Sequence, residues 1–483
     1  MDRVLNWAIF LLLATAITGC RSAPIQQREP TRRPPSGFET SEREPKAGLI
    51  QPISHTQDLD TDETAVERIP LEPELTATHS TPPPIPQESK SNHDIDRPHD
   101  LEQIQQLALA TNPAIAEIDA EIESLKGKHT QAGLPPNPTV GINAEDINED
   151  GRAGRYGVYF GRQVVRGNKL QLSRSVVCAE IEAAKHRREV VVQKLQTDVR
   201  KAFFNLLITQ RRIKTIEQLV ELSQQAVNTT EKLHEADEVA LTAVLQAELE
   251  LQNAKVFLKQ SANQKLGAKR RLASFLGEAE LPFDSVSGDI HTLAALDDFE
   301  RSYDQLLAAS PEVSVLFAEV EQQRRNLSRQ IAEPIPNLTW QSTLQFDTVT
   351  DDLVAGFQIG MPLPRLNQNQ GAIYQSQYQI VAAERRAEKK ALDLRQRLAT
   401  AYQDYIDSQI QVEAFENEII PKAEQTLDLI NQAYQAGELP FLQLLTAQRT
   451  NTQTQLTYLR QLQILWERHW EVTGMLLSGS LEN

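Results

Sequence analysis

A cysteine near the N-terminus has the clearest chemical signature in this sequence. Residues 17–20 are Ile-Thr-Gly-Cys, and they close an apolar run that starts at Val4 after a short basic n-region. The run is too short to span a bilayer as a mature helix and is typical of a signal peptide. Its end resembles a bacterial lipobox, in which diacylglycerol is attached to the thiol and the chain is cleaved before it. We predict a signal peptide over residues 1–20 and lipidation of Cys20; the alternative is a chance cysteine in an ordinary signal peptide. Arg21, not Asp, follows, which by analogy with the enterobacterial sorting rule permits transport to the outer membrane.

Elsewhere the reactive residue types form no recognisable catalytic arrangement. The sequence has no HExxH, P-loop, GxSxG or CxxC motif. Residues 93–100 include two histidines and three aspartates that could bind a metal weakly. Their spacing matches no closed metal site. We therefore predict a protein that is not an enzyme and has no cofactor or metal site.

The net charge of −17 limits the choice of partner. Nucleic acid is not an expected partner, because phosphate binding needs clustered Lys and Arg. An acidic balance suits a cationic solute or partner, although solvated surface residues account for most such charge. The low aromatic content of 6% favours long helices over a compact α/β body.

Two short segments predict tight turns between long helices. Residues 434–449 are YQAGELPFLQLLTAQR, in which a helical pattern stops at Gly437 and another starts near Pro440. Glycine adopts the positive φ that often follows a helix, and proline suits the first helical turn. Residues 234–249, HEADEVALTAVLQAEL, repeat this pattern 200 positions earlier. Each segment predicts the tip of an αα-hairpin.

These tips belong to an internal duplication. A shift of 198 to 200 positions relates further pairs of landmarks: Asn112-Pro113 and Ser310-Pro311, Pro136-Asn137 and Pro336-Asn337, Gly161 and Gly360, and Phe203 and Tyr402. We predict one repeat over residues 99–290 and a second over residues 291–478, with a C-terminal tail over residues 479–483. The proline-rich stretch over residues 21–98 predicts a disordered tether.

Each repeat predicts one helix, two strands and a long helical hairpin. The first helices cover residues 101–131 and 299–332, the long helices residues 168–235 and 370–436, and the returning helices residues 239–276 and 440–477. Pro421 predicts a kink in the second long helix. The expected fold class is mainly α with a small β part, built from tandem-repeat helical hairpins.

The strand-like runs alternate between apolar and polar residues. Between positions 338 and 346 the even positions are Leu, Trp, Ser, Leu and Phe, and the odd positions are Thr or Gln. Residues 353–363 continue the alternation, and residues 139–145 and 156–160 show it in the first repeat. This pattern is typical of transmembrane β-barrel strands, or of a soluble hairpin with one wet face. A closed barrel needs about eight strands, so several chains would share one, and three chains would supply twelve.

The order of these elements resembles the outer-membrane factors of tripartite efflux and secretion systems, the TolC-like family. The resemblance covers residues 101–477 and rests on Asn112-Pro113, the two tips, and residues 133–138, 167–169, 360–363, 369–371 and 420–423. The lipobox and residues 133–138 are closer to the lipoprotein or heavy-metal, CzcC-like branch.

The resemblance implies a homotrimeric exit duct with a shared 12-stranded transmembrane β-barrel and a periplasmic α-barrel. Its partners would be outer-membrane lipid, a periplasmic adaptor and an inner-membrane pump of the resistance-nodulation-division type. The passively conducted solutes would be heavy-metal cations; a duct for drugs or secreted proteins is an alternative. The rival from another class is a periplasmic coiled-coil adaptor or scaffold lipoprotein, although adaptors usually have one hairpin, not two.

The resemblance also implies roles for the tips. Adaptor docking would involve Tyr434, Gly437, Glu438, Leu439, Pro440, Phe441, Asp237, Glu238 and Val239. Two positions that are acidic at the periplasmic constriction of TolC itself are Gln443 and Thr446 here, and Ala243 is the first-tip counterpart of Gln443. These three residues are the constriction candidates, and no acidic ring is expected at them.

Overall fold

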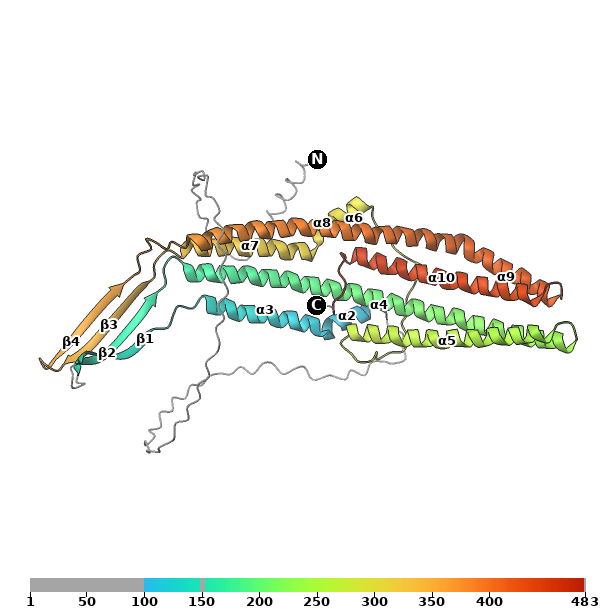
Figure 1. The fold of residues 1–483 in the computed structure, drawn as a ribbon, viewed down its shortest axis with the longest axis horizontal. Helices are drawn as coiled ribbons and strands as arrows, with labels where there is room; N and C mark the ends of the chain where they lie inside the picture. Colours follow the sequence, from blue (N-terminus) through green and yellow to red (C-terminus); the bar gives the residue numbers. More distant parts are fainter. Residues whose placement is uncertain (1–99, 148–152, 482–483) are drawn as a thin grey trace, which may run out of the picture. The chain divides into compact units, whose positions relative to one another are not determined.

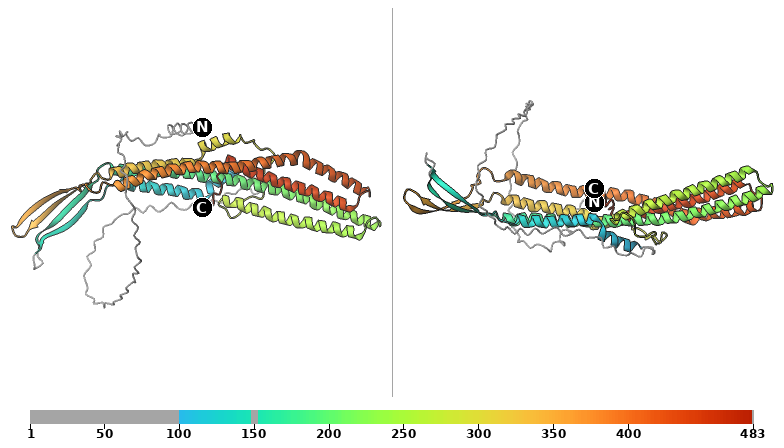
Figure 2. Two further views of the ribbon diagram at one scale, coloured as in Figure 1. Left: turned by 45° about the horizontal axis from the view of Figure 1, so that its top comes forward. Right: turned by 90° about the horizontal axis from the view of Figure 1, so that it is seen from below.

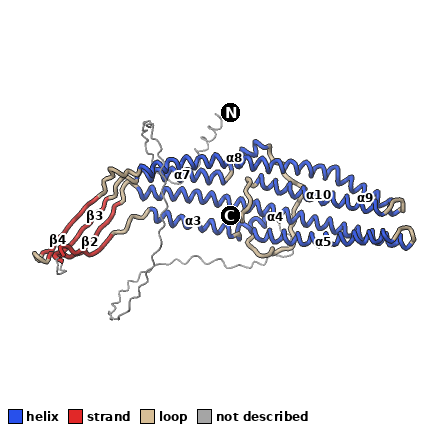
Figure 3. The backbone as a smooth tube through the Cα atoms, in the orientation of Figure 1, coloured by secondary structure: helices blue, strands red, loops and turns tan. Residues whose placement is uncertain are grey.

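The computed structural model describes residues 100–147 and 153–481, which all belong to one compact unit, Glu88–Asn483. The predicted signal peptide, the lipidation site Cys20 and the predicted tether lie outside the described residues. Within this unit the four strands lie at one end of the helices, and the two hairpin tips lie at the other end (Figure 1). Figure 3 separates the strands from the helices by colour.

The described elements follow the same order twice along the chain. The first repeat contains α2 (Leu101–Thr111), α3 (Pro113–Ala132), β1 (Thr139–Ile147), β2 (Ala153–Val164), α4 (Lys169–Glu235) and α5 (Leu241–Phe275). The second contains α6 (Phe299–Ala309), α7 (Pro311–Ala332), β3 (Leu338–Asp347), β4 (Asp352–Gly360), α8 (Gln370–Ala414), the π-helical turn η2 (Phe415–Ile419), α9 (Ile420–Gln435) and α10 (Phe441–Thr473). The predicted fold class and duplication are confirmed.

The prediction of one uninterrupted helix before the strands of each repeat is wrong. Asn112 is extended, with φ −69° and ψ 125°, so it ends α2 and caps α3. Its side chain accepts a hydrogen bond from the Ala114 N–H at 2.8 Å. Ser310 has nearly the same conformation between α6 and α7. The residue before a proline disfavours the helical region, and a proline cannot continue the hydrogen-bond ladder of the helix before it.

Two other prolines limit the second repeat. The predicted alternation over residues 353–363 extends too far, because β4 ends at Gly360 and the following segment contains Pro362 and Pro364. Proline has no N–H to donate to a sheet. The kink predicted at Pro421 is confirmed: α8 ends at Ala414 and the π-helical turn intervenes before α9. The missing donor of Pro421 is placed in the first turn of α9, where it is not needed.

The strands form one antiparallel sheet in the order β1-β2-β3-β4, and the β2–β3 pair joins the two repeats. The register places Ile142 opposite Val158, Val158 opposite Leu344, and Leu344 opposite Ala355. Directly paired residues share a face of a sheet. The apolar residues of all four strands therefore lie on one face, and the polar residues lie on the other.

The helices pack around a core that both repeats supply. Its fully buried members include Phe203 and Leu206 of α4, Leu272 of α5, and Leu462 of α10. The ring of Trp466 stacks on Phe204 with 3.8 Å between the centroids. In both views of Figure 2 the α4–α5 hairpin runs alongside the α9–α10 hairpin. The core thus holds the two hairpin tips next to each other.

Candidate functional site

The two hairpin tips have the same backbone geometry although their residues differ. In the second tip Gly437 has φ +76°, and the N–H of Glu438 donates to the carbonyl of Ala433 at 2.9 Å. In the first tip Asp237 has φ +62°, and the N–H of Glu238 donates to the carbonyl of Leu233 at 2.8 Å. This pattern closes a helix with a residue of positive φ, which Gly adopts freely and Asp tolerates. Both sequence-predicted turns are confirmed.

The tips expose some of the predicted docking residues and bury others. Asp237, Glu238, Gly437, Glu438 and Pro440 are exposed. Val239 and Leu439 are half-buried. These seven residues are the tip surface that a partner can reach.

Tyr434 and Phe441 instead lie inside the molecule, with 2% and 5% of their surface exposed. Their ring centroids are 5.9 Å apart, and the Tyr434 hydroxyl lies 3.0 Å from the Thr230 hydroxyl of α4. They join the two hairpins and cannot contact a docking partner without moving. The structure therefore removes these two residues from the predicted docking surface.

The constriction candidates lie one to two helical turns from the tips. Gln443 and Thr446 are exposed, and Ala243 is half-buried. The Thr446 hydroxyl donates to the Leu442 carbonyl of its own helix at 2.7 Å. These side chains bring no charge to the site.

An ion pair that the sequence did not reveal lies nearby. Arg449 of α10 pairs with Glu250 of α5, and this bond raises the pKa of the Arg449 guanidinium. Arg449 is well exposed, so solvent screens the attraction. The sequence signal was indirect: the two positions differ by 199 residues, close to the repeat shift, and they become neighbours only because the hairpins lie side by side.

The apolar face of the sheet is unusually exposed for a folded chain. The exposed fraction is 85% for Ile142, 78% for Val140, 67% for Phe357 and 44% for Phe160. The opposite face holds an ion pair between Arg155 and Asp347 at 3.0 Å. A contiguous apolar patch of this kind marks a surface that contacts another protein or lipid.

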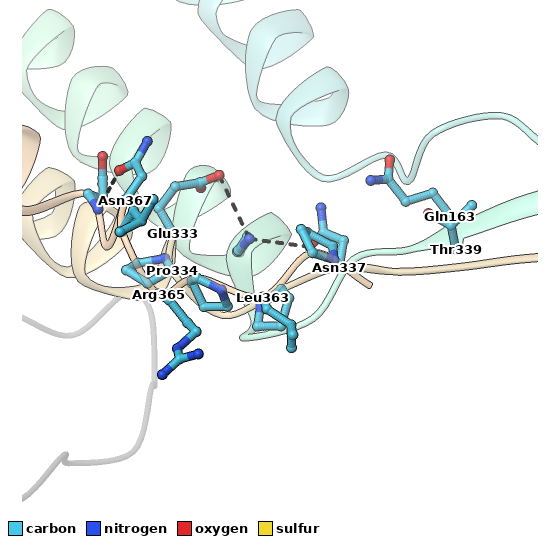
Figure 4. Close-up of a pocket in the computed structure, with 14 residues that line it drawn as sticks. Gln163, Glu333, Pro334, Asn337, Thr339, Leu363, Arg365 and Asn367 are labelled. Atoms are coloured by element: carbon cyan, nitrogen blue, oxygen red, sulfur yellow. Dashed lines mark hydrogen bonds and ion pairs between the residues drawn. The ribbon is translucent and has the colours of Figure 1, made fainter. Parts of the chain in front are cut away.

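A buried lysine braces the place where strands become helices (Figure 4). Lys169, the first residue of α4, is 5% exposed; its Nζ lies 3.3 Å from Asn337 Oδ1 and 3.7 Å from Glu333 Oε1. The depression around it has a volume of roughly 970 Å³ and is lined by the segment that follows β4, including Pro362 and Arg365. Lys169 thereby ties the start of α4 to the connection between α7 and β3. Because its charge is already paired, it explains the geometry of this junction without a ligand.

The described residues contain no group of three or more His, Cys, Asp or Glu side chains arranged to hold a metal ion. Among these residues, no helix combines the length and the apolar character needed to cross a membrane.

Solved structures with the same fold are membrane channels. The outer-membrane channel OprN superposes with a TM-score of 0.66 at 17% identity, covering 79% of this chain and 90% of that one. A structure of CusC, from a study of its folding and transmembrane channel formation, gives a TM-score of 0.66 at 15% identity and covers 84% and 100%. At these identities the likeness concerns the fold, including the paired strands and both hairpins.

Sequence relatives agree with the fold. The cobalt-zinc-cadmium resistance protein CzcC of Cupriavidus metallidurans is 24% identical over 369 residues, which span 75% of this chain and 86% of that protein. Residues 104–278 and 302–465 match the family model described as outer membrane efflux protein, one block in each repeat. The chain therefore belongs to the outer membrane efflux protein family, as the tandem repeat had indicated.

Proposed function

We propose that three copies of this chain form the exit duct of a tripartite efflux system in the outer membrane. The observation that supports this most directly is the sheet, which combines an exposed apolar face with two unpaired edges. The duct conducts solutes passively from an inner-membrane pump of the resistance-nodulation-division type and a periplasmic adaptor to the exterior.

The open sheet edges favour an assembly of several chains. The outer edges of β1 and β4 have no partner strand among the described residues. In lipid, each unpaired backbone N–H and C=O costs several kcal/mol, so a membrane-spanning sheet must close on itself. Four strands cannot close, and about eight are the minimum for a barrel. Three copies supply twelve strands, with the apolar face towards lipid and the polar face towards the lumen.

The tips are the proposed contact with the adaptor. The reachable residues Asp237, Glu238, Val239, Glu438 and Leu439 combine acidic and apolar character. Gln443, Thr446 and Ala243 remain the proposed constriction residues. The rival adaptor or scaffold function has less support, because the family match includes both repeats.

Heavy-metal cations are the proposed solutes. The named function of the relative CzcC and the net charge of −17 support this choice. Lipid attachment at Cys20 and the proline-rich tether would then anchor the duct near the membrane surface. Both stay predictions.

Cell fractionation with native mass measurement tests the duct itself. We expect a trimer in the outer-membrane fraction. A soluble or inner-membrane monomer would contradict the proposal.

Growth of a deletion strain tests the solute. We expect sensitivity to zinc, cobalt, cadmium or copper salts, and complementation by the wild-type gene. Sensitivity only to dyes and antibiotics would refute the metal assignment while leaving the duct intact.

A tip substitution tests adaptor docking. Leu439→Asp places a charge on the reachable tip surface, so we expect it to lower metal resistance in the complemented strain at unchanged trimer content. Leu429→Asp, on an exposed position of α9 two turns before the second tip, is the control. Equal resistance in the Leu439→Asp strain and the wild type would argue against docking through this tip.

A further inference from the structure

The repeat within the chain contains an interface that provides a template for a second one. α4 of the first repeat packs against α7 of the second, and β2 pairs with β3. We infer that α8 and β4 of one copy bind α3 and β1 of a second copy in the register of this internal interface. The inference rests on the multi-chain duct proposed above and adds the residues that meet.

Burial establishes how α8 corresponds to α4. Leu195 and Ala184 of α4 have no exposed surface, and Leu394 and Ala383 of α8 are exposed by 0% and 2%. Both pairs are 199 positions apart. A helix presents the same face only when its register is kept, so this shift applies along the aligned faces.

The correspondence of α3 and α7 follows in the same way. Pro113 and Pro311 begin these helices, 198 positions apart. The buried residues Ile122 and Val320, exposed by 8% and 5%, keep that shift.

The two shifts convert one internal contact into a predicted contact between copies. Inside the chain, Arg325 of α7 donates from Nη1 to the carbonyl of Ser175 in α4 at 3.1 Å. The counterpart of Arg325 is Gly127 of α3, and the counterpart of Ser175 is Tyr374 of α8. A large residue on α7 faces a small one on α4, whereas between copies the small residue is on α3 and the large one on α8. The exchange of sizes keeps the two helices at a similar separation.

The single chain gives no use for either residue. A Cβ added to Gly127 would meet nothing within 4 Å, yet glycine weakens a helix interior. Tyr374 is 62% exposed, and its ring lies 4.7 Å from that of Tyr378, which is 58% exposed. Ala179, the counterpart of Tyr378, is only 2% exposed. Two adjacent exposed aromatic rings opposite a bare backbone form a complementary pair of surfaces.

The sheet gives an independent register for the same interface. Thr139 pairs with Gly161, and Thr339 pairs with Gly360, so β1 corresponds to β3 at a shift of 200 and β2 to β4 at 199. The internal β2–β3 pair of Gly161 and Gln341 then becomes Gly360 opposite Gly141 of the second copy.

One step along the strands, this register places Ile359 opposite Ile142. Both side chains lie on the apolar face, and they are exposed by 57% and 85% in the single chain. A shift of one residue would instead pair apolar with polar residues. On the other face Gln358 comes opposite Asn143, whose buried Oδ1 has no hydrogen-bond partner in the single chain.

Disulfide trapping tests the strand register. In the variant with Ile142→Cys and Ile359→Cys, oxidation of outer membranes should give covalent dimers and trimers on a non-reducing gel. Directly opposite residues are about 4.5–5.5 Å apart between Cα atoms, within the range of a disulfide. Within one chain the two positions lie three strand spacings apart, roughly 14 Å, so the bond can form only between copies.

A displaced pair is the matched control. Ile142→Cys with Phe357→Cys moves one cysteine two residues along the same face, beyond disulfide reach. We expect at least ten-fold less cross-linking for this pair. Each single-cysteine variant controls for the native Cys20 and Cys178.

A size-compensation experiment tests the helix contact. Gly127→Trp should lower the ratio of trimer to monomer in detergent at least ten-fold, because the indole overlaps Tyr374 of the next copy. Adding Tyr374→Ala to the same chain should restore most of the trimer. Gly127→Ala is the matched control and should leave assembly near the wild-type ratio.

The outcomes separate this inference from the proposed function. A monomeric wild-type protein would overturn both. A wild-type trimer in which the displaced pair cross-links, neither pair does, or Gly127→Trp assembles normally would overturn the interface register and leave the duct standing.

Discussion

Helices α5 and α10 return from corresponding tips, yet their matching apolar residues have opposite surroundings. Leu445 of α10 is 6% exposed, whereas its counterpart Leu245 of α5 is 55% exposed. Phe441 and Leu241 show the same contrast, with 5% and 56% exposed. Similar residue types at the same place in the repeat are core in one helix and surface in the other.

The difference follows from where each helix lies in the chain. α10 packs against α4, α8 and α9, whereas the main neighbour of α5 is α4. α10 therefore closes the contact between the two repeats, and α5 lies at the outer side of the first. The comparison teaches that a duplicated chain satisfies its internal interface once and leaves a second, equivalent surface exposed.

The largest expected effect comes from truncating the paired leucines. Leu445→Ala should lower the free energy of unfolding of the monomer by about 2–5 kcal/mol, because it opens a cavity among Tyr434, Phe441 and Leu444. Leu245→Ala should change it by less than about 0.5 kcal/mol, because the side chain is exposed. Urea unfolding followed by circular dichroism measures both. Equal losses would break the comparison between the two helices.

A pH dependence sharpens the same contrast. Burial, and to a lesser degree the positive charge of Arg200, lowers the pKa of His469 in α10 to about 4. The unfolded chain takes up this proton below about pH 6.5, while the folded chain resists it until about pH 4. The stability contribution is thus fully present above pH 6.5 and falls as the pH drops towards 4, by about 3 kcal/mol in all.

Unfolding free energies of the monomer between pH 7 and pH 4 check this prediction. His469→Gln should remove the dependence. The counterpart of His469 in α5 is Lys269, which is partly exposed and bonds Asp284 at 2.8 Å. Lys269→Gln should keep the wild-type slope, because lysine does not titrate in this range. A wild-type slope in the His469→Gln variant would refute the assignment.

The smallest expected effect distinguishes the two tips. Gly437→Ala should cost about 1–2 kcal/mol, because alanine disfavours φ +76° even though its Cβ would meet no atom. Asp237→Gly should change stability by less than about 0.5 kcal/mol, because relief of strain at φ +62° is offset by the added freedom of the unfolded chain. Thermal unfolding of the two variants checks this. A larger change for Asp237→Gly than for Gly437→Ala would reverse the expected order.

Local features of the fold could be predicted from single residues. Gly437 and Pro440 marked a tip, Pro421 marked an interruption, and alternation marked the strands. The break at Asn112 was missed although Pro113 signalled it, because a helical pattern on both sides outweighed one proline. The overlong β4 was missed for the same reason, since alternation continued past Pro362.

The candidate site was predictable only in outline. Sequence order placed Tyr434, Phe441 and Leu439 together at one tip. It could not separate the buried aromatic pair from the reachable leucine, because that depends on α4 supplying Thr230 beneath the tip. The Arg449–Glu250 pair was missed because its two members meet across separate hairpins.

By itself the sequence determined the two repeats, their turns, the amphipathic strands and the family, because each of these is encoded in residue types at short or constant spacing. Only the tertiary structure decided which of two equivalent faces is covered. Leu445 and Leu245 obey the same local preferences, and so do Ser175 and Tyr374. Their surroundings differ because packing one repeat against the other buries a single copy of an interface that the sequence encodes twice.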